Sequence, residues 1–112
     1  MEQRTAAVVV TYNRRDLLEQ CLQALLGQTA PCTVLLVDNA STDGTGEWAR
    51  ALAEKEPRVL YRNTGANLGG AGGFSFGMRW ALEDGYDYIW LMDDDTLPHK
   101  DALQRLLEDY ES

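Results

Sequence analysis

Apolar side chains along this chain follow two patterns that alternate. Short runs rich in aliphatic and β-branched residues are typical of buried strands, and each run is too short for a helix. Four such runs occur, at residues 6–11, 33–37, 58–61 and 88–92. Elsewhere the apolar side chains recur every three or four residues, which predicts amphipathic helices. Four helical segments follow the strands in turn, around residues 17–26, 48–52, 74–82 and 103–110.

Strict alternation of strand and helix indicates a parallel sheet covered by helices on both faces. Connections between parallel strands are nearly always right-handed, so we predict an α/β three-layer sandwich of the half-Rossmann type. The expected order of the strands in the sheet is 3-2-1-4. The length of 112 residues suits one domain, residues 1–112, and no linker or internal repeat divides it.

Turn and cap residues indicate where the helices begin. Ser41, Thr42 and Asp43 are capping candidates before the second helix, and we assign Asp43 this structural role. Pro98 is expected near the first turn of the fourth helix, where a missing N–H group does no harm.

Composition and charge exclude several classes of protein. The sequence is 45% hydrophobic and 25% charged, as in folded proteins. The formal net charge is −8 and the arginines are scattered, which argues against a nucleic-acid surface. Phosphate binding must therefore be local or assisted by a metal. No apolar run reaches the roughly 18 residues of a membrane span, and no secretory signal is evident, so a cytoplasmic location is expected.

The two cysteines, Cys21 and Cys32, form no metal-binding or redox motif. Cys21 falls on the apolar stripe of the first predicted helix, where a small buried thiol is the expected role. Both thiols are expected to be reduced.

Three adjacent carboxylates, Asp93, Asp94 and Asp95, directly follow the fourth predicted strand and are called the acidic triplet below. Asp93 and Asp95 are separated by one residue and can face one pocket. Mg²⁺ or Mn²⁺ would accept their oxygens and leave positions for substrate phosphates. We interpret Asp95 as a metal ligand, with Asp93 binding directly or through water. The alternative is that the triplet caps the following helix, for which one Asp would suffice.

Asp38 ends the second predicted strand, before the turn-forming sequence NASTDGT. In open α/β sheets ligands bind beyond the carboxyl ends of the strands. Three loops are predicted to meet there, at residues 12–14, 38–41 and 93–95. At this place Asp38 either hydrogen-bonds a nucleobase or ribose, or stabilises the turn, and its position alone leaves both roles open.

Six of the ten glycines lie in the segment NTGANLGGAGGFSFG, residues 63–77. Gly69, Gly70, Gly72 and Gly73 are expected immediately before the third helix. Backbone could approach a ligand closely there, and the helix N-terminus would favour an anion. The segment is not a dinucleotide fingerprint, because that loop follows the first strand. A flexible loop is the alternative interpretation.

Four motifs occur in order at the predicted strand ends: VVVTYNR (8–14), LLVDNASTDGT (35–45), NLGGAGGFSFG (67–77) and WLMDDD (90–95). Together they resemble the family 2 glycosyltransferases of the GT-A fold, in particular the bacterial branch that includes rhamnosyltransferases and galactofuranosyltransferases. The resemblance implies transfer of a sugar, usually with inversion, from a UDP- or dTDP-linked donor, assisted by Mn²⁺ or Mg²⁺. The implied acceptor is a saccharide or a lipid-linked molecule in cell-surface polysaccharide synthesis.

The resemblance also assigns roles to single residues. Thr11, Tyr12 and Arg14 match the segment that holds the base and the diphosphate, and Asp38 matches the carboxylate at the base or ribose.

Asn67, with Gly69 and Gly70, matches the loop that borders the donor sugar. The acidic triplet matches the D-x-D metal motif, with Asp93 and Asp95 as metal ligands and with Asp93 and Asp94 also beside the donor.

The family carries its general base, its acceptor site and often a metal-binding His well after the D-x-D motif, whereas this sequence ends at Ser112. His99 is too close to the motif for that role and is expected at an exposed helix start. We therefore interpret the chain as the N-terminal, nucleotide-binding part of a longer enzyme at the inner face of the membrane. Faces that the rest would cover predict self-association into a homo-oligomer.

Two other functions remain open. A strand that ends in Asp-x-Asp suits aspartyl-phosphate chemistry with Mg²⁺, but that pattern belongs on the first strand and wants Thr or Val where this chain has Leu97. A non-catalytic module that binds nucleotide weakly, or serves only for interaction, is the second.

Overall fold

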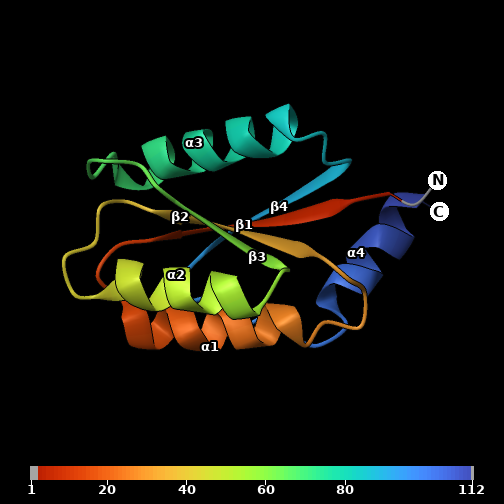
Figure 1. Cartoon of the computed structure of the whole chain (residues 1–112). Helices are drawn as coiled ribbons and strands as arrows, with labels where there is room; N and C mark the ends of the chain where they lie inside the picture. Colours follow the sequence, from red (N-terminus) through yellow and green to blue (C-terminus); the bar gives the residue numbers. More distant parts are fainter. Residues whose placement is uncertain (1–2, 112) are drawn as a thin grey trace.

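The computed structural model describes residues 3–111, which form a four-stranded parallel sheet and four helices (Figure 1). The strands are β1 (Thr5–Thr11), β2 (Thr33–Asp38), β3 (Val59–Asn63) and β4 (Tyr88–Asp93). The helices are α1 (Arg15–Leu26), α2 (Thr45–Lys55), α3 (Gly69–Glu83) and α4 (Ala102–Glu111). The order in the sheet is β3-β2-β1-β4, which confirms the predicted class and strand order. Residues 1, 2 and 112 of the predicted domain lie outside the described residues.

Helices cover both faces of the sheet, with α3 over one face and α1 and α2 over the other (Figure 1). Alternate side chains of the central strands belong to two separate apolar clusters. Val8 and Val37 lie in the cluster under α3, whereas Val9 and Leu36 lie in the cluster under α1 and α2. Because successive side chains of a strand point to opposite faces, this alternation also decides where the polar side chains at the strand ends point.

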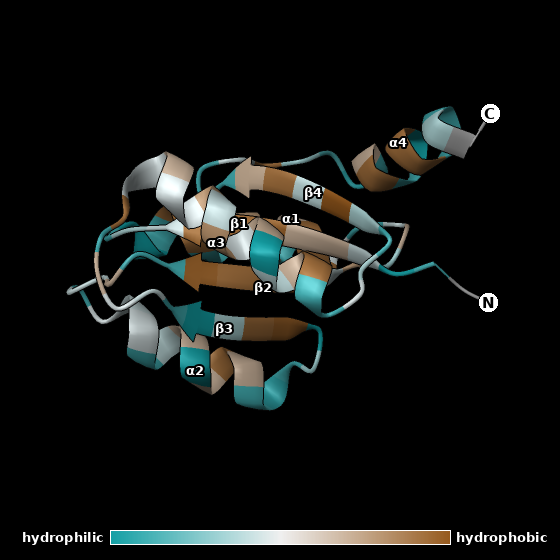
Figure 2. Ribbon diagram, turned by 90° about the horizontal axis from the view of Figure 1, so that it is seen from above, coloured by the Kyte–Doolittle hydropathy of each residue, from teal (hydrophilic) through white to brown (hydrophobic). Residues whose placement is uncertain are grey.

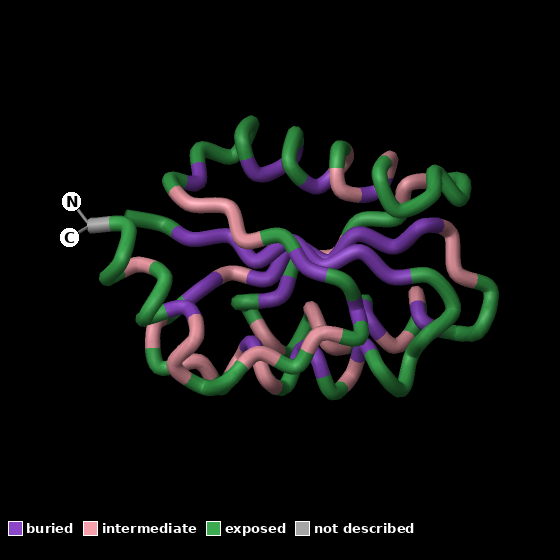
Figure 3. Tube along the Cα trace, turned by 180° about the vertical axis from the view of Figure 1, so that it is seen from behind, coloured by how far each residue is buried: buried purple, intermediate pink, exposed green. Residues whose placement is uncertain are grey.

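The central strands carry most of the buried core (Figure 3). All seven residues of β1 are buried, while β3 and β4 at the edges are partly exposed. The carboxyl ends of the strands are aligned: Thr11 pairs with Asp38, Val10 with Asp93, and Asp38 with Asn63. Figure 2 shows the hydrophobic start of β3 giving way to a hydrophilic end. Polar residues from all four strands therefore lie side by side at the carboxyl ends of the strands.

Helix α3 lies unusually close to the sheet because it carries glycines on its inner face. A Cβ atom on Gly77 would lie 2.3 Å from Val8 Cγ1, and one on Gly73 would lie 2.6 Å from Val10 Cγ1. The expectation that four glycines precede this helix is wrong, since α3 begins at Gly69 and includes the other three. The need for close packing outweighs the low helix propensity of glycine.

Helix α4 lies away from the aligned strand ends, with Leu103 buried and the ring of Tyr110 set edge-on to Tyr88 at 5.2 Å. Pro98 lies four residues before α4, because residues 96–99 have no regular secondary structure and a turn at residues 100–101 precedes the helix. His99 is exposed, as expected, and pairs with Asp101. Among the described helices, none combines the length and the apolar character needed to cross a bilayer.

Two smaller expectations concern Asp43 and the cysteines. Asp43 accepts hydrogen bonds from the N–H and hydroxyl groups of Thr45 in the first turn of α2, although the residue at the cap position is Gly44. Cys21 and Cys32 are free and buried, as predicted. Burial raises the pKa of Cys21 to about 12 and that of Cys32 to about 11, so both are neutral packing groups at neutral pH.

Candidate functional site

A cleft of about 470 Å³ opens at the aligned strand ends. The end of β1 contributes Thr11, Tyr12 and Arg14, and the segment that starts α3 contributes Asn67, Gly69 and Gly70. The acidic triplet forms a further wall. Every site residue predicted from the sequence lines this cleft except Asp38.

Burial alternates along the acidic triplet. Met92 and Asp94 are buried, whereas Asp93 and Asp95 are exposed. Met92 packs in the cluster under α1 and α2, so Asp94 continues on that side of the sheet. The first and third carboxylates are thus accessible from the cleft, while the middle one is an internal group.

Asp94 joins β4 to β1. Its Oδ2 atom accepts a 2.9 Å hydrogen bond from the hydroxyl of Thr11, and both residues are buried. Burial raises the pKa of the Asp94 carboxyl, and the Thr11 hydrogen bond and the nearby Arg14 partly offset that rise. Cys21 of α1 lies beneath this junction, with its thiol 3.8 Å from the carbonyl oxygen of Asp93. The triplet is therefore supported from below by α1 and from the side by β1.

Arg14 supplies positive charge to the triplet. Its Nη1 atom lies 3.5 Å from Oδ1 of Asp94 and 3.8 Å from Oδ2 of Asp95. The side chain of Arg14 is 54% exposed, so it also faces the solvent of the cleft. Asp94 and Asp95 thus share the guanidinium of Arg14.

Asp93 and Asp95 fit a hard divalent cation by the chemistry of their oxygens. They do so only as a partial set of ligands, because no group of three or more His, Cys, Asp or Glu side chains within residues 3–111 is arranged to hold a metal. Asp94 is committed to Thr11. A metal at this place would need further oxygen ligands, of the kind that phosphate groups and water provide.

Asp38 lies outside the cleft and is fully buried. Its Oδ2 atom accepts a 2.6 Å hydrogen bond from the hydroxyl of Tyr61, and its Oδ1 atom accepts one from the N–H group of Ser41. One oxygen therefore holds the loop between β2 and α2, and the other ties the end of β2 to β3. Of the two roles considered for Asp38, the structure displays the turn-stabilising one.

Asn39 lines the cleft where Asp38 does not; its loop was expected there, but the sequence predicted no role for Asn39. Its side chain donates a 3.0 Å hydrogen bond to the carbonyl oxygen of Gly69 and accepts one from Thr64. These contacts tie the end of β2 to the start of α3. The signal was present in the alternation of β2: Val37 faces α3, so Asn39, two residues later, faces the same side.

The loop after β1 meets the loop after β2, as predicted, and Asn13, for which the sequence predicted no role, joins them. Its backbone N–H group donates to Ser41 Oγ at 2.9 Å, and its Oδ1 atom accepts from the N–H group of Thr42 at 2.7 Å. Asn13 has a φ of 51°, a left-handed conformation that Asn tolerates better than most residues. Tyr12 is 42% exposed beside it.

At the glycine-rich wall, Asn67 begins the turn that leads into α3, because its Oδ1 atom accepts a hydrogen bond from the N–H group of Gly69. Gly69 has a φ of +76°, and a Cβ atom on Gly70 would meet nothing within 4 Å. Space therefore remains in front of this part of the backbone.

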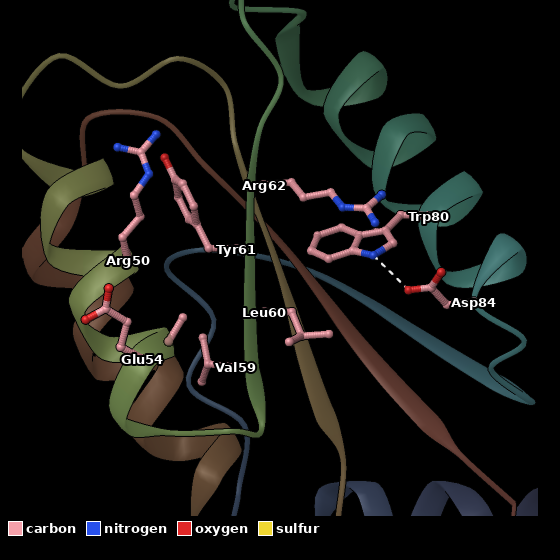
Figure 4. A pocket seen from close by; sticks show the side chains of 9 residues that line it. Arg50, Glu54, Val59, Leu60, Tyr61, Arg62, Trp80 and Asp84 are labelled. Atoms are coloured by element: carbon pink, nitrogen blue, oxygen red, sulfur yellow. Dashed lines mark hydrogen bonds between the residues drawn. The ribbon is translucent and has the colours of Figure 1, made fainter.

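A second hollow, of about 500 Å³, runs along the outer edge of β3 (Figure 4). Arg50 lies over the ring of Tyr61 and Arg62 over the ring of Trp80, with guanidinium-to-ring distances of 5.3 and 4.3 Å. Figure 4 shows the two pairs on opposite sides of the strand. Positive charge along a sheet edge opposes pairing with another strand, so we expect Arg50 and Arg62 to discourage strand addition at β3.

Comparison with known proteins identifies the family of this chain. The sequence model of "Glycosyl transferase family 2" matches residues 6–112. The chain belongs to glycosyl transferase family 2. The predicted resemblance is therefore confirmed, and the cleft lies on a GT-A fold.

Two relatives show which members of the glycosyl transferase family this chain is similar to. The chain is 42% identical over 107 residues to the undecaprenyl-phosphate mannosyltransferase of Micrococcus luteus, covering 94% of this chain and 43% of the relative. It is 44% identical over 98 residues to the galactofuranosyltransferase GlfT1 of Mycobacterium tuberculosis, covering 85% of this chain and 31% of the relative. The chain thus spans less than half the length of either relative.

Solved structures agree on the fold. The mannosyltransferase PcManGT from Pyrobaculum calidifontis, in complex with GDP-Man and Mn²⁺, superposes with a TM-score of 0.79 at 29% identity, covering 96% of this chain and 32% of that protein. S. aureus TarS reaches a TM-score of 0.83 at 22% identity, over 97% of this chain and 32% of that one.

Proposed function

We propose that this chain binds the nucleoside diphosphate of a sugar donor, as the donor-binding part of an inverting glycosyltransferase. The observation that carries the proposal is the meeting of three features in one cleft: Arg14, the exposed carboxylates of the acidic triplet and the glycine-rich start of α3. A guanidinium and the N–H groups of a helix N-terminus both favour phosphate oxygens. Carboxylates favour the metal that accompanies a diphosphate.

In this proposal Asp93 and Asp95 hold Mn²⁺ or Mg²⁺ together with diphosphate oxygens. A bound metal neutralises negative charge on the departing diphosphate. Asp94 keeps Thr11 and Arg14 in place, so that the guanidinium is held near the phosphates. Asn67, Gly69 and Gly70 border the sugar, and Tyr12 and Asn39 lie beside them on the remaining walls.

The proposed donor remains UDP- or dTDP-linked, and GDP joins the candidates because PcManGT was solved with GDP-Man and Mn²⁺. We assign a saccharide or lipid-linked acceptor in cell-surface polysaccharide synthesis, which the names of the mannosyl- and galactofuranosyltransferase relatives support. The proposed location is the cytoplasm, at the inner face of the membrane. An inverting transfer also requires a general base within hydrogen-bond reach of the acceptor hydroxyl, and no residue of this cleft is assigned that role.

Thermal melts test the donor assignment. The chain is heated with UDP, dTDP or GDP, each with and without MnCl₂. A nucleotide present at 100 times its dissociation constant should stabilise the fold by about 2.7 kcal/mol, which is a readily measured shift. The shift should require metal and should be lost in Asp95→Asn. A flat response to every pair of nucleotide and metal would identify a non-binding module instead.

A further inference from the structure

Arg14 is placed between two carboxylates but is bound tightly to neither. Its distances of 3.5 Å to Asp94 and 3.8 Å to Asp95 exceed the roughly 2.7–2.9 Å of a charge-assisted hydrogen bond. With its side chain 54% exposed, Arg14 is held mainly by the charge of the triplet. Such a side chain can change partner at low cost.

The two carboxylates differ in their freedom. Asp94 is buried and also accepts the Thr11 hydrogen bond, so it remains a fixed anion beside Arg14. The side chain of Asp95 is 54% exposed, and Arg14 Nη1 lies 3.8 Å from its Oδ2 atom. A divalent cation on Asp95 would therefore approach the oxygen that Arg14 faces, and two positive groups at that distance repel each other.

We propose that Arg14 is the internal counter-ion of the acidic triplet and couples metal binding to nucleotide binding. Without nucleotide, Arg14 neutralises Asp95 and opposes a divalent cation there. When metal and diphosphate enter together, the metal takes Asp95 and the guanidinium turns to the phosphate oxygens. This inference rests on the proposed function and adds a mechanism by which metal and nucleotide are bound cooperatively.

Thermodynamic linkage makes the idea measurable. If nucleotide provides the displaced guanidinium with a new partner, it strengthens metal binding, and metal strengthens nucleotide binding by the same factor. Removal of the guanidinium should then have two opposite effects: tighter binding of metal alone and weaker coupling between metal and nucleotide. A residue that only supports the fold would not produce this pair of effects.

The neighbouring Arg15 is a matched control. Its guanidinium lies over the ring of Trp48 at 5.7 Å, and in the described part of the chain it forms no ion pair with the triplet. Arg15→Gln and Arg14→Gln change the net charge equally. Any difference between them therefore reports the local contact with Asp94 and Asp95.

The experiment measures free Mn²⁺ by electron paramagnetic resonance during titration of wild type, Arg14→Gln, Arg14→Lys and Arg15→Gln, with and without UDP or GDP. Arg14→Gln should bind Mn²⁺ alone about fivefold more tightly, the size expected from loss of an exposed charge contact, and should lose most of the nucleotide effect. Arg15→Gln should match wild type. Arg14→Lys should keep the weak binding of Mn²⁺ alone.

Two results overturn the inference while leaving the proposed function intact. One is equal affinity of Arg14→Gln and wild type for Mn²⁺ alone, and the other is an equal gain in Arg15→Gln. If wild type binds Mn²⁺ and neither nucleotide in any combination, the proposed function itself fails. Circular dichroism of each variant confirms that the fold is retained, as expected for an exposed side chain.

Discussion

The hydroxyl of Thr11 donates a 2.9 Å hydrogen bond to Oδ2 of Asp94, across 83 positions of sequence. Thr11 is 1% and Asp94 4% exposed, so water cannot readily replace this contact. The bond fixes the end of β1 against the end of β4, the two strand ends that lead to Arg14 and to the acidic triplet. The geometry of the cleft therefore depends on a residue that faces the core.

Thr11→Val keeps the shape of the side chain and removes the donor. The buried carboxylate of Asp94 then lacks one partner, and we expect the free energy of unfolding to fall by about 1–3 kcal/mol. Urea denaturation measures the loss, and Thr11→Ser, which keeps the hydroxyl, is the control. Equal stability of the Val and Ser variants would show that the hydrogen bond contributes little.

Asp94→Asn should stabilise the protein in a pH-dependent manner. Burial raises the pKa of Asp94 above its usual 3.8, so the folded state holds this proton more tightly than the unfolded chain does. Its contribution to stability is therefore greatest at low pH and is lost as pH rises through the folded pKa. The Asn variant avoids that loss and can still accept from Thr11.

The measurement for Asp94→Asn is the difference in Tm between the variant and wild type, taken at pH values from below the usual pKa of an Asp carboxyl to above the raised pKa of Asp94. The difference should become more positive as pH rises through the raised pKa and then level off. Asp93→Asn, which removes an exposed carboxylate next to it, controls for the change in net charge. A difference that stays constant with pH would mean that Asp94 titrates as it does in the unfolded chain.

Gly77→Ala should destabilise the fold. The added Cβ would lie 2.3 Å from Val8 Cγ1 and 3.1 Å from Val37 Cγ2, so α3 must move away from the sheet. We expect a loss of about 1–3 kcal/mol, as for other overpacked cores. Gly70→Ala is the control, because its Cβ meets nothing within 4 Å, and chemical denaturation of both variants gives the comparison. Similar stabilities would mean that the helix shifts without cost.

Tyr61→Phe tests whether the outer strand supports the cleft. The variant removes the 2.6 Å hydrogen bond to the buried carboxylate of Asp38, and hydrogen bonds to charged groups contribute about 1.5–3 kcal/mol. Nucleotide affinity should also fall, because Asp38 holds the loop that begins at Asn39. Denaturation and nucleotide titration measure the two effects. Tyr110→Phe is the control: this tyrosine is 75% exposed, so the variant should change neither stability nor nucleotide affinity. Unchanged nucleotide affinity in Tyr61→Phe would limit Tyr61 to a role in stability.

The outer edge of β4 should promote self-association of this chain. In the described part of the sheet β4 pairs only with β1, and exposed apolar side chains lie on and near it, including Leu91 at 37% and Leu106 at 51% exposure. Light scattering should show a mass that rises with concentration. Leu91→Lys should reduce it, since a charged edge residue opposes strand pairing, whereas Leu82→Lys on α3 should not. A strict monomer at every concentration would contradict the expectation.

Local patterns were sufficient to predict the strands, their order and most of the cleft. The apolar runs are buried on both sides, and a right-handed crossover leaves few arrangements, so the end of β1 and the acidic triplet were expected to meet. The start of α3 was harder to predict. Glycine disfavours helices, and only the contacts of Gly73 and Gly77 with the sheet explain why the helix begins within the glycine run.

Asp38 and Tyr61 show what sequence patterns leave undetermined. A polar residue at a strand end faces one of two sides, and the choice depends on the register of the whole strand. Tyr61 comes close to Asp38 because Leu36 pairs with Tyr61 and Asp38 with Asn63 in parallel β2 and β3. That register is a tertiary property, so the buried partner of Asp38 does not follow from local sequence.

The bare inner face of α3 also reaches the cleft, because Gly73 packs against two of the residues that line it. A Cβ atom on Gly73 would lie 2.6 Å from Val10 Cγ1 and 3.0 Å from the side-chain nitrogen of Asn39, and both Val10 and Asn39 line the cleft. A side chain added at position 73 would therefore press on Val10 and Asn39 from the helix side and reshape this part of the cleft through its lining.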